Sequence, residues 1–337
     1  MESFGIYTLA NDAVFDQLVA LLNSIEVNVN PNIPICIIPY NDQLDRVREE
    51  VKARNNVTLF ANRESIQRWD NFADEVWAVH PAAKQGNSAR NIWYRTPLLR
   101  KMCAFDGEFE KFVFYDADSL AMNPQDNLLD KLSNYDFIFD DWEHKKSRED
   151  AALNLSIIEN TGLYKEEDVR PKLHCSSFFA SKKGIFQEDE CEFLQQLLIE
   201  KDEIQWVARW WDDAFLFSYM TLRCNRPLFN FTLSPNGQER TGNCANADPF
   251  VNIDHVLYNK EGLKPIHRLH YMGYSYSDFA RLSQGEDVNI CYRDEFLYYR
   301  FLKEPEKKPK QFKKAGIATK TNRLLNKTLK KIQQMIN

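Results

Sequence analysis

The strongest constraint on the fold is an alternation of β-rich and helical segments near the N-terminus. The predicted strands are residues 4–9, 33–40 and 57–60, and the predicted helices are residues 13–25 and 43–54. Because crossover helices connect parallel strands, this alternation predicts an α/β layer architecture. Ligands bind at the carboxyl ends of the strands in open α/β sheets, so we expect the functional site at these strand exits.

Polar residues follow the first two predicted strands. Asn11 and Asp12 stand where the first helix needs an N-cap, and Asn41 and Asp42 stand before the second. Asn and Asp side chains accept hydrogen bonds from free backbone N–H groups at helix starts. These residues are therefore predicted as helix caps, and they are also candidates for ligand contacts.

Two carboxylates follow a further predicted strand, residues 111–115, which ends on Asp116-Ala117-Asp118. Two residues apart in an extended chain, they lie on the same side and can converge on one cation. A hard divalent cation takes oxygen ligands and bridges protein carboxylates to phosphate oxygens. The alternative is that Asp116 caps a turn and Asp118 is a solvated neighbour. The position after an apolar strand favours a metal site.

The second half of the chain has a looser pattern. A predicted strand at residues 135–139 ends on two Asp residues, and a strand at 175–181 and helices at 189–202 and 212–222 follow. No internal repeat is present. We therefore predict one catalytic domain, residues 1–302, in which a boundary near residue 150 separates a nucleotide half from an acceptor half.

The charge is distributed unevenly along the 337 residues. Residues 303–337 carry eleven Lys or Arg and two Glu, so the net charge of −6 for the whole chain leaves −15 on residues 1–302. An acidic body argues against nucleic acid as a partner, because binding to nucleic acid depends on cations opposite phosphates. In the tail, Leu325, Leu329, Ile332 and Ile336 have helical spacing. Such a basic amphipathic helix suits an anionic membrane surface, and docking on the acidic body is the alternative.

The sequence also carries indications of the cellular compartment. The first residues lack the basic and apolar regions of a secretory signal, and no stretch is apolar for long enough to span a bilayer. The seven Cys residues form no Cys-x-x-Cys pair and no zinc spacing, so we expect free thiols. We therefore expect a cytoplasmic protein that contacts the inner membrane surface peripherally through its tail.

A second motif stands late in the chain, where His270-Tyr271-Met272-Gly273 follows another strand-like run. With Asp116-Ala117-Asp118, the two motifs resemble, in order, those of metal-dependent GT-A-type glycosyltransferases, most closely the family of glycogenin and bacterial lipooligosaccharide galactosyltransferases. In that family an Asp-x-Asp follows a strand, and the His of a C-terminal His-Phe-x-Gly completes the metal site. The resemblance covers residues 4–275 and implies a Rossmann-like mixed sheet flanked by helices.

The same resemblance implies a site for Mn2+ or Mg2+ held by Asp116, Asp118 and His270. The alternative for His270 is a structural imidazole, and His267 is taken as a bystander. The residues implied in nucleotide binding are Thr8, Leu9, Ala10, Asn11, Asp12, Tyr40, Arg95, Lys101 and Ala117. Helix capping explains Asn11 and Asp12 equally well, and an exposed helix face would explain the two cations.

Two further segments match the family only in part. Trp211-Asp212-Asp213 resembles its Asp-Gln-Asp element, so Asp212 and Asp213 are the candidate catalytic residues. Trp211 stands where the family has its first Asp, and Asp212 stands where it has Gln. Cys175-Ser176-Ser177 stands where the family has Asn-x-Gly. These departures leave the sugar specificity open.

The resulting hypothesis is a metal-dependent hexosyltransferase. It would move a hexose from a nucleotide-diphosphate sugar, expected to be a UDP-sugar, to a hydroxyl group of a sugar, lipid or protein. Retention of the anomeric configuration is implied by the resemblance alone. One rival is a haloacid dehalogenase-type phosphatase, because Asp116-Ala117-Asp118-Ser119 also fits its nucleophile motif, although that motif usually opens its domain. The other rival is a non-catalytic carbohydrate- or nucleotide-binding protein with a transferase fold.

Overall fold

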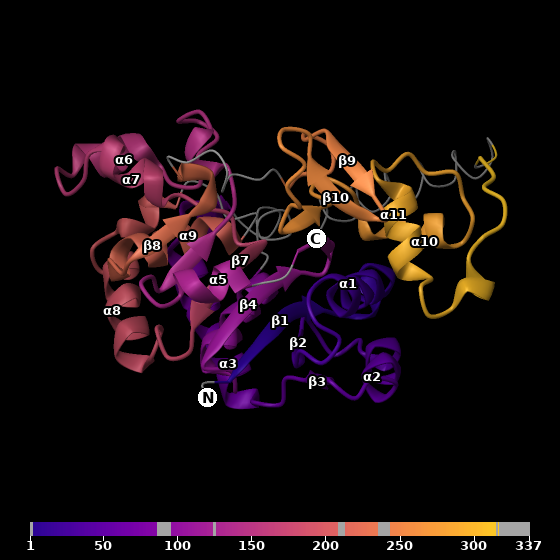
Figure 1. Cartoon of the computed structure of the whole chain (residues 1–337). Coiled ribbons are helices and arrows are strands. Elements are labelled where there is room, and N and C mark those ends of the chain that lie inside the picture. Colours follow the sequence, from indigo (N-terminus) through magenta and orange to yellow (C-terminus); the bar gives the residue numbers. More distant parts are fainter. Residues whose placement is uncertain are drawn as a thin grey trace.

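A seven-stranded mixed sheet forms the centre of the molecule (Figure 1). The structure is a computed structural model that describes residues 3–85, 96–123, 126–207, 213–234, 243–314 and 316. The strand order in the sheet is β3-β2-β1-β4-β7-β6-β8. These strands are β1 (Phe4–Ala10), β2 (Ile35–Pro39), β3 (Val57–Leu59), β4 (Lys111–Asp116), β6 (Phe137–Phe139), β7 (Phe178–Lys182) and β8 (Leu228–Asn230).

The pairing of the strands confirms the predicted α/β class. The first four strands of the order pair in parallel, with β1 between β2 and β4. β7 runs antiparallel to both β4 and β6, which makes the sheet mixed, as the family resemblance implies. All six predicted strands are present within a few residues of their predicted bounds. The sheet includes strands from both sides of residue 150, so the two predicted halves share one sheet.

Helices cover both faces of the sheet. On one face lie α1 (Phe15–Asn28), α2 (Asp45–Lys52) and α5 (Asp126–Lys131), and on the other lie α3 (Arg63–Val79), η3 (Thr96–Asp106), α6 (Leu155–Asn160), α8 (Glu188–Ile199) and α9 (Asp213–Cys224). Shorter helices are η1 (Asp12–Val14), η2 (Pro81–Gln85), η4 (Glu143–Lys145), α7 (Glu166–Val169), η5 (Arg170–Lys172), η6 (Glu203–Trp206), η7 (Phe231–Leu233) and η9 (Pro305–Lys307). The predicted helices 13–25, 43–54, 189–202 and 212–222 correspond to α1, α2, α8 and α9. α3 was not predicted, and η3 was anticipated only as the exposed helix face that would explain Arg95 and Lys101.

The central strands are apolar on both faces, as strands covered on both sides must be. Along β4, Val113 packs into the cluster beneath α1, whereas Phe112 and Phe114 pack into the cluster beneath α3 and α9. Successive side chains of a strand point to opposite faces, so one short strand contributes to both cores. The sheet is therefore a firm base for the residues at its carboxyl edge.

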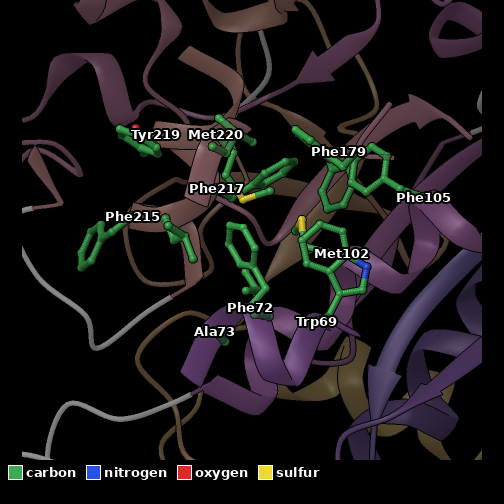
Figure 2. Close-up of a cluster of buried hydrophobic side chains, with 14 of the residues drawn as sticks. Trp69, Phe72, Ala73, Met102, Phe105, Phe179, Phe215, Phe217, Tyr219 and Met220 are labelled. Atoms are coloured by element: carbon green, nitrogen blue, oxygen red, sulfur yellow. The ribbon is translucent and has the colours of Figure 1, made fainter. Parts of the chain in front are cut away.

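The larger core fixes η3 in place. Figure 2 shows side chains of α3, η3, β7 and α9 meeting in one cluster, among them Trp69, Met102, Phe179 and Phe217. The ring of Phe105 in η3 stacks on Phe179 with centroids 5.9 Å apart. Truncating one buried aromatic side chain costs about 3–5 kcal/mol, so the cluster as a whole is a large contribution to the stability of the fold. η3 consequently holds the residue next to Met102, Lys101, in a defined position.

The C-terminal part of the chain forms a smaller third core beside α1. Its elements are β5 (Ser119–Ala121), β9 (Phe250–Ile253), β10 (Val256–Asn259), β11 (Arg268–His270), α10 (Tyr276–Ser283) and α11 (Arg293–Arg300). α11 packs on α1, and Figure 1 shows α10 and α11 (yellow) on the side of the sheet opposite to α6 and α7. β11 pairs antiparallel with β5, which directly follows the turn after β4. The end of the domain is thereby brought to the Asp-x-Asp turn.

The beginning of the predicted tail is attached to the body. Lys303 forms an ion pair with Glu26 at 2.6 Å, and Lys313 exchanges backbone hydrogen bonds with Gly285 and Asp287. The predicted amphipathic helix, with its apolar positions from Leu325 to Ile336, lies outside the described residues. Among the helices of the described part, none combines the length and apolarity needed to cross a membrane.

Candidate active site

The Asp-x-Asp segment forms a tight turn between β4 and β5. β4 ends at Asp116, Ala117 and Asp118 make the turn, and β5 begins at Ser119. In the antiparallel pair of β5 and β11, His270 lies opposite Ser119. The backbone N–H of Tyr271 donates to the carbonyl of Asp118 at 3.0 Å. These backbone contacts hold His270 beside the turn, so the side-chain arrangement follows from strand pairing.

The three predicted metal ligands come together. Ligand atoms of Asp116, Asp118 and His270 all lie within 4.8 Å of one another, and Nε2 of His270 is 3.5 Å from Oδ1 of Asp118. Two carboxylate oxygens and one imidazole nitrogen form a donor set that suits Mn2+ and is compatible with Mg2+. The residues present therefore fit a divalent cation.

The pKa values of these three side chains are set by their burial and by the charges that surround them. Burial raises the pKa of Asp116, and the charge of Lys101 only partly offsets this. Burial also opposes ionisation of Asp118, but the charge of His270 and its hydrogen bond lower the pKa of Asp118 overall. Burial disfavours the His270 imidazolium, yet Asp118 outweighs it and raises the pKa of His270 to about 9. Without metal, His270 is thus positively charged near neutral pH.

Lys101 is a buried cation that links two carboxylates of the site. Its side chain is 1% exposed, and Nζ lies 3.1 Å from Asp116 Oδ1 and 2.7 Å from Asp213 Oδ2. Nζ also donates to the carbonyl and the hydroxyl of Ser176 at 3.2 and 3.1 Å. The interpretation of Lys101 as part of an exposed helix face is wrong, because η3 turns it toward the carboxyl edge of the sheet. The predicted residues Lys101, Asp116 and Asp213 therefore form one connected group.

The first strand exit is shaped by helix capping. Asn11 accepts a hydrogen bond from the N–H of Ala13 and donates to the side chain of Asn41 at 3.2 Å. Asp12 accepts from the N–H of Val47 in the first turn of α2. Asp12 thus serves as the cap of α2 from a distance, whereas the predicted caps of α2 were Asn41 and Asp42. The N-cap residue of α2 itself is Leu44, which has no side-chain cap hydrogen bond.

The remaining predicted nucleotide residues differ in their exposure. Thr8, Leu9, Ala10 and Ala117 are buried, so any contact they make with a nucleotide must come chiefly from their backbone. Tyr40 is half-buried at the exit of β2, and its N–H donates to the carbonyl of Ala10 at 2.9 Å. Both strand exits therefore lie side by side. Nucleotide binding by these residues stays a prediction.

Arg100 also lies at this edge, and it was not among the predicted site residues. Its guanidinium pairs with both oxygens of Asp70 at 2.8 and 2.6 Å. It also donates to the carbonyls of Pro39 and Tyr40 at 3.3 and 3.0 Å, which fixes the exit of β2. A bidentate Arg–carboxylate pair is strongly oriented. Its partner Asp70 belongs to α3, and because α3 was not predicted, no sequence signal connected the two.

A second buried cation, Arg268, lies on the same face of β11 as His270, two residues earlier. Its side chain is 1% exposed, and Nη2 is 3.2 Å from Oδ1 of Asp140. Within the described part of the chain, Nε and Nη1 of Arg268 have no hydrogen-bond partner. His267, the predicted bystander, is 1% exposed, stacks on Phe178 and points Nδ1 at Asp140 at 3.5 Å. Both residues anchor β11 on the end of β6.

The segment that replaces the family's Asn-x-Gly borders the same group. The N–H of Cys175 donates to Asp141 at 2.9 Å, and Asp141 also accepts from the N–H of Glu143. Burial raises the pKa of Asp141 to about 7. Ser176 contacts Lys101, as described above. The segment therefore connects the ends of β6 and β7 to the cluster.

Three residues of interest lie outside the described residues. Arg95 was predicted to meet the nucleotide, Asp212 was predicted as a catalytic residue, and Trp211 was noted as a departure from the family pattern. Asp213, the neighbour of Asp212, begins α9 and is 8% exposed. Of the two predicted catalytic residues, the structure thus describes only Asp213.

Comparisons with known proteins connect this geometry to glycosyltransferases through the fold. Neither a protein-family model nor a curated protein matches the chain. The bifunctional glycosyltransferase WbbM, in its apo structure, is 13% identical with a TM-score of 0.53, and the match covers 91% of this chain and 52% of WbbM. This chain therefore spans about half the length of WbbM.

Two further glycosyltransferase structures align less well. Mouse xyloside xylosyltransferase 1 in its apo form is 7% identical with a TM-score of 0.48, and the match covers 67% of this chain and 83% of that protein. The galactosyltransferase LgtC in complex with donor and acceptor sugar analogues is 11% identical with a TM-score of 0.46, covering 88% and 95%. The WbbM match, with the mixed sheet, shows that this chain has a GT-A-type glycosyltransferase fold.

Proposed function

We propose that this protein is a divalent-metal-dependent glycosyltransferase that transfers a hexose from a nucleotide-diphosphate sugar to a hydroxyl acceptor. The observation that carries the proposal is the convergence of Asp116, Asp118 and His270 from two distant parts of the chain at the carboxyl edge of the sheet. This is the edge at which open α/β sheets bind ligands. The fold shared with WbbM supports the same class of activity.

The proposed metal is Mn2+ or Mg2+, held by Asp116, Asp118 and His270. When bound, the cation would offset the charge that develops on the departing diphosphate. The carboxylates around the site favour a bound cation. Asp116 and Asp213 both contact the buried ammonium of Lys101, and the imidazole must be neutral to coordinate.

Lys101 is proposed as the residue that orients the two carboxylates on either side of it. Its ammonium contacts Asp116 on the metal side and Asp213 on the side of α9. A buried charge-assisted hydrogen bond holds both carboxylates in place before a substrate arrives. Asp213, together with Asp212, is proposed to face the transferred sugar and the acceptor.

The nucleotide is proposed to lie over the exits of β1 and β2. Arg100 fixes the carbonyl of Tyr40, and Asn11 is tied to Asn41, so this edge is rigid before binding. UDP is the expected nucleotide, and retention of the anomeric configuration is the expected outcome. Both rest on the family resemblance of the motifs.

The tail is proposed to guide the protein to its acceptor. Residues 303–337 carry eleven Lys or Arg and only two Glu, whereas residues 1–302 have a net charge of −15. A basic amphipathic segment binds anionic lipid surfaces, where a lipid-linked acceptor would be found. Peripheral contact with the inner membrane surface is the localisation that follows.

A thermal-shift screen of nucleotides and nucleotide sugars, with Mn2+ and with EDTA, tests this proposal. A ligand at about a hundred times its dissociation constant stabilises the native state by roughly 2.7 kcal/mol. We expect UDP or a UDP-sugar to raise the melting temperature only when Mn2+ is present. The Asp116→Asn variant should lose that shift while keeping the melting temperature of the metal-free protein. An equal shift with EDTA would contradict the metal site.

The two rival functions predict different outcomes. A phosphatase of the haloacid dehalogenase type would hydrolyse p-nitrophenyl phosphate in the presence of a divalent cation. The fold argues against this, because Asp116 ends the fourth strand of the chain and not the first. A non-catalytic binding protein would show the thermal shift with UDP and no turnover of any UDP-sugar.

A further inference from the structure

Residues 243–245 run alongside the strand that carries the metal-binding histidine. His270 and Cys244 form a parallel β-bridge. The N–H of His270 donates to the carbonyl of Asn243 at 2.6 Å, and the N–H of Ala245 donates to the carbonyl of His270 at 2.9 Å. His270 therefore has Ser119 on one side, from β5, and Cys244 on the other. This second neighbour has no counterpart among the predicted site residues.

The side chains continue this contact as a hydrogen-bonded chain. Bridge partners on neighbouring strands carry their side chains on the same face, so the thiol of Cys244 lies beside the imidazole of His270, and it helps to raise the pKa of His270. The thiol donates to Oδ1 of Asn243 at 3.1 Å, and Nδ2 of Asn243 donates to the carbonyl of Asp140 at 2.7 Å. A thiol can act as a weak donor and a weak acceptor at the same time. The chain thus leads from the metal ligand to the end of β6.

The backbone around the thiol is fixed as well. The carboxylate of Asp248 accepts from the N–H groups of Asn243 and Cys244, both at 3.1 Å. Asn243 is 3% exposed. Cys244 itself is half-buried and forms no disulfide. Its thiol is held in one place, close to the imidazole, without a covalent bond.

The orientation of the imidazole shows which ring nitrogen faces the proposed metal. Nε2 of His270 faces Asp118 at 3.5 Å, on the metal side. The opposite nitrogen, Nδ1, is then the one available for a hydrogen bond with the thiol. We propose that Cys244 is a positioning residue of the metal site, because its thiol accepts a hydrogen bond from Nδ1–H of His270 and keeps the lone pair of Nε2 directed at the cation. This inference rests on the proposed metal-dependent function.

Partners of this kind are energetically significant in metal sites. A ligating His almost always donates its second ring N–H to a neighbouring acceptor, which fixes its tautomer and orientation. Losing such a partner costs about 10- to 100-fold in metal affinity. At most sites the acceptor is a carboxylate or a carbonyl, and here it is a thiol that is itself oriented by Asn243.

Mn2+ binding to the full chain, followed by electron paramagnetic resonance of the free ion, tests the assignment. Cys244→Ala removes the acceptor and should weaken Mn2+ binding about 10- to 100-fold. Cys244→Ser keeps a donor and an acceptor in the same place and should restore most of the affinity. Cys291→Ala, at an exposed cysteine that is not part of this chain of hydrogen bonds, is the matched control and should bind as the unmodified protein does.

A second readout follows the hydrogen bond directly. In the Mg2+-loaded protein, the Nδ1–H proton of His270 observed by NMR should exchange with water faster in Cys244→Ala than in Cys244→Ser. If Cys244→Ala fails to fold, Cys244→Val takes its place, since it also lacks the acceptor and fills more of the space. Equal Mn2+ affinity of the Ala or Val variant and the unmodified protein overturns the proposal, and so does equal weakening by Ala and Ser.

These outcomes separate the inference from the function on which it rests. An unmodified protein that binds no Mn2+ contradicts the proposed function itself. An unmodified protein that binds Mn2+, with no loss in Cys244→Ala, contradicts only the role of Cys244.

Discussion

Nε2 of His270 lies 3.5 Å from Oδ1 of Asp118, and this contact joins the C-terminal strand β11 to the turn that ends β4. The imidazole reaches the turn because β11 pairs with β5 and is anchored through Arg268 on Asp140. The proposed metal site is therefore assembled only when the C-terminal core has folded onto the sheet.

The Asp118→Asn variant should lose metal-dependent nucleotide binding and keep its fold. The substitution removes one oxygen ligand and the charge that favours the imidazolium, so the pKa of His270 should fall from about 9 toward its ordinary value. Calorimetry of UDP with Mn2+ measures the first effect, and an NMR titration of His270 measures the second. Unchanged UDP affinity together with an unchanged His270 pKa would rule out the assignment of Asp118.

Mn2+ binding should release a proton at neutral pH. The raised pKa of His270 means that the metal-free imidazole is protonated below about 9, and coordination requires the neutral form. Apparent Mn2+ affinity should therefore fall by up to about tenfold per pH unit below that value. The sign for the metal-free fold is the opposite: the raised pKa of His270 gives a stabilising contribution that is complete below the unfolded-state value near ~6.5 and is lost as pH rises through about 9.

Calorimetric titration with Mn2+ in two buffers of different ionisation enthalpy counts the released protons. His255→Asn, at an imidazole in the turn between β9 and β10, is the control and should leave the count unchanged. His267→Ala is not suitable, because His267 is buried against Phe178 and Asp140. A proton count of zero at neutral pH would contradict the charged state of His270 and move the acid limit to the ordinary His range, near ~6.5.

Hydrophobic patterning made the sheet predictable. The runs at 4–9, 33–40 and 111–115 are apolar on both faces, which is what β1, β2 and β4 require between two layers of helices. The family resemblance implied a mixed sheet but not which strand is reversed, because nothing in a run such as 175–181 specifies the direction in which it pairs with its neighbours. α3 was missed, and with it the ion pair of Asp70 and Arg100.

The proposed metal ligands were predictable because each belongs to a short motif at the end of a strand. The support around them was not. Arg268 pairs with Asp140, which is distant in sequence, and Cys244 lies beside His270 on a neighbouring strand, so the roles proposed for them depend on which strands become neighbours. Asp12 shows the same limitation. A cap for α2 was expected from Asn41 or Asp42, which stand shortly before α2 in the sequence, but the capping carboxylate is that of Asp12 at the neighbouring strand exit. Contacts of this kind are properties of the tertiary fold.

Replacing Lys101 should destabilise the fold, and removing one of its partners should restore part of the loss. Lys101→Met breaks the buried ion pair with Asp213, and breaking such a pair costs about 3–5 kcal/mol. In the double variant Lys101→Met/Asp213→Asn, the carboxylate charge of Asp213 is removed together with the ammonium, so the two effects should not add. Urea unfolding of the single and double variants measures this. Additive losses would show that the 2.7 Å contact contributes no coupling.

Shortening the tail should separate nucleotide binding from membrane contact. A chain ending at Gly316 keeps the contacts of Lys303 with Glu26 and of Lys313 with Gly285, which an end at Leu302 would remove. It should bind UDP with Mn2+ as the full chain does, and it should no longer sediment with anionic vesicles. Vesicles of zwitterionic lipid are the control. If the full chain never sediments with anionic vesicles, the tail is not a membrane anchor.

Asp116, Asp118 and His270 are proposed to hold the cation that supports transfer of a hexose from a nucleotide sugar. The most direct test of this proposal is UDP release from a panel of UDP-sugars, measured with Mn2+ and with EDTA. The account predicts release from at least one UDP-sugar that requires Mn2+ and is abolished in Asp116→Asn, with no hydrolysis of p-nitrophenyl phosphate. UDP binding without release from any sugar, or phosphate ester hydrolysis lost in Asp116→Asn, would contradict it.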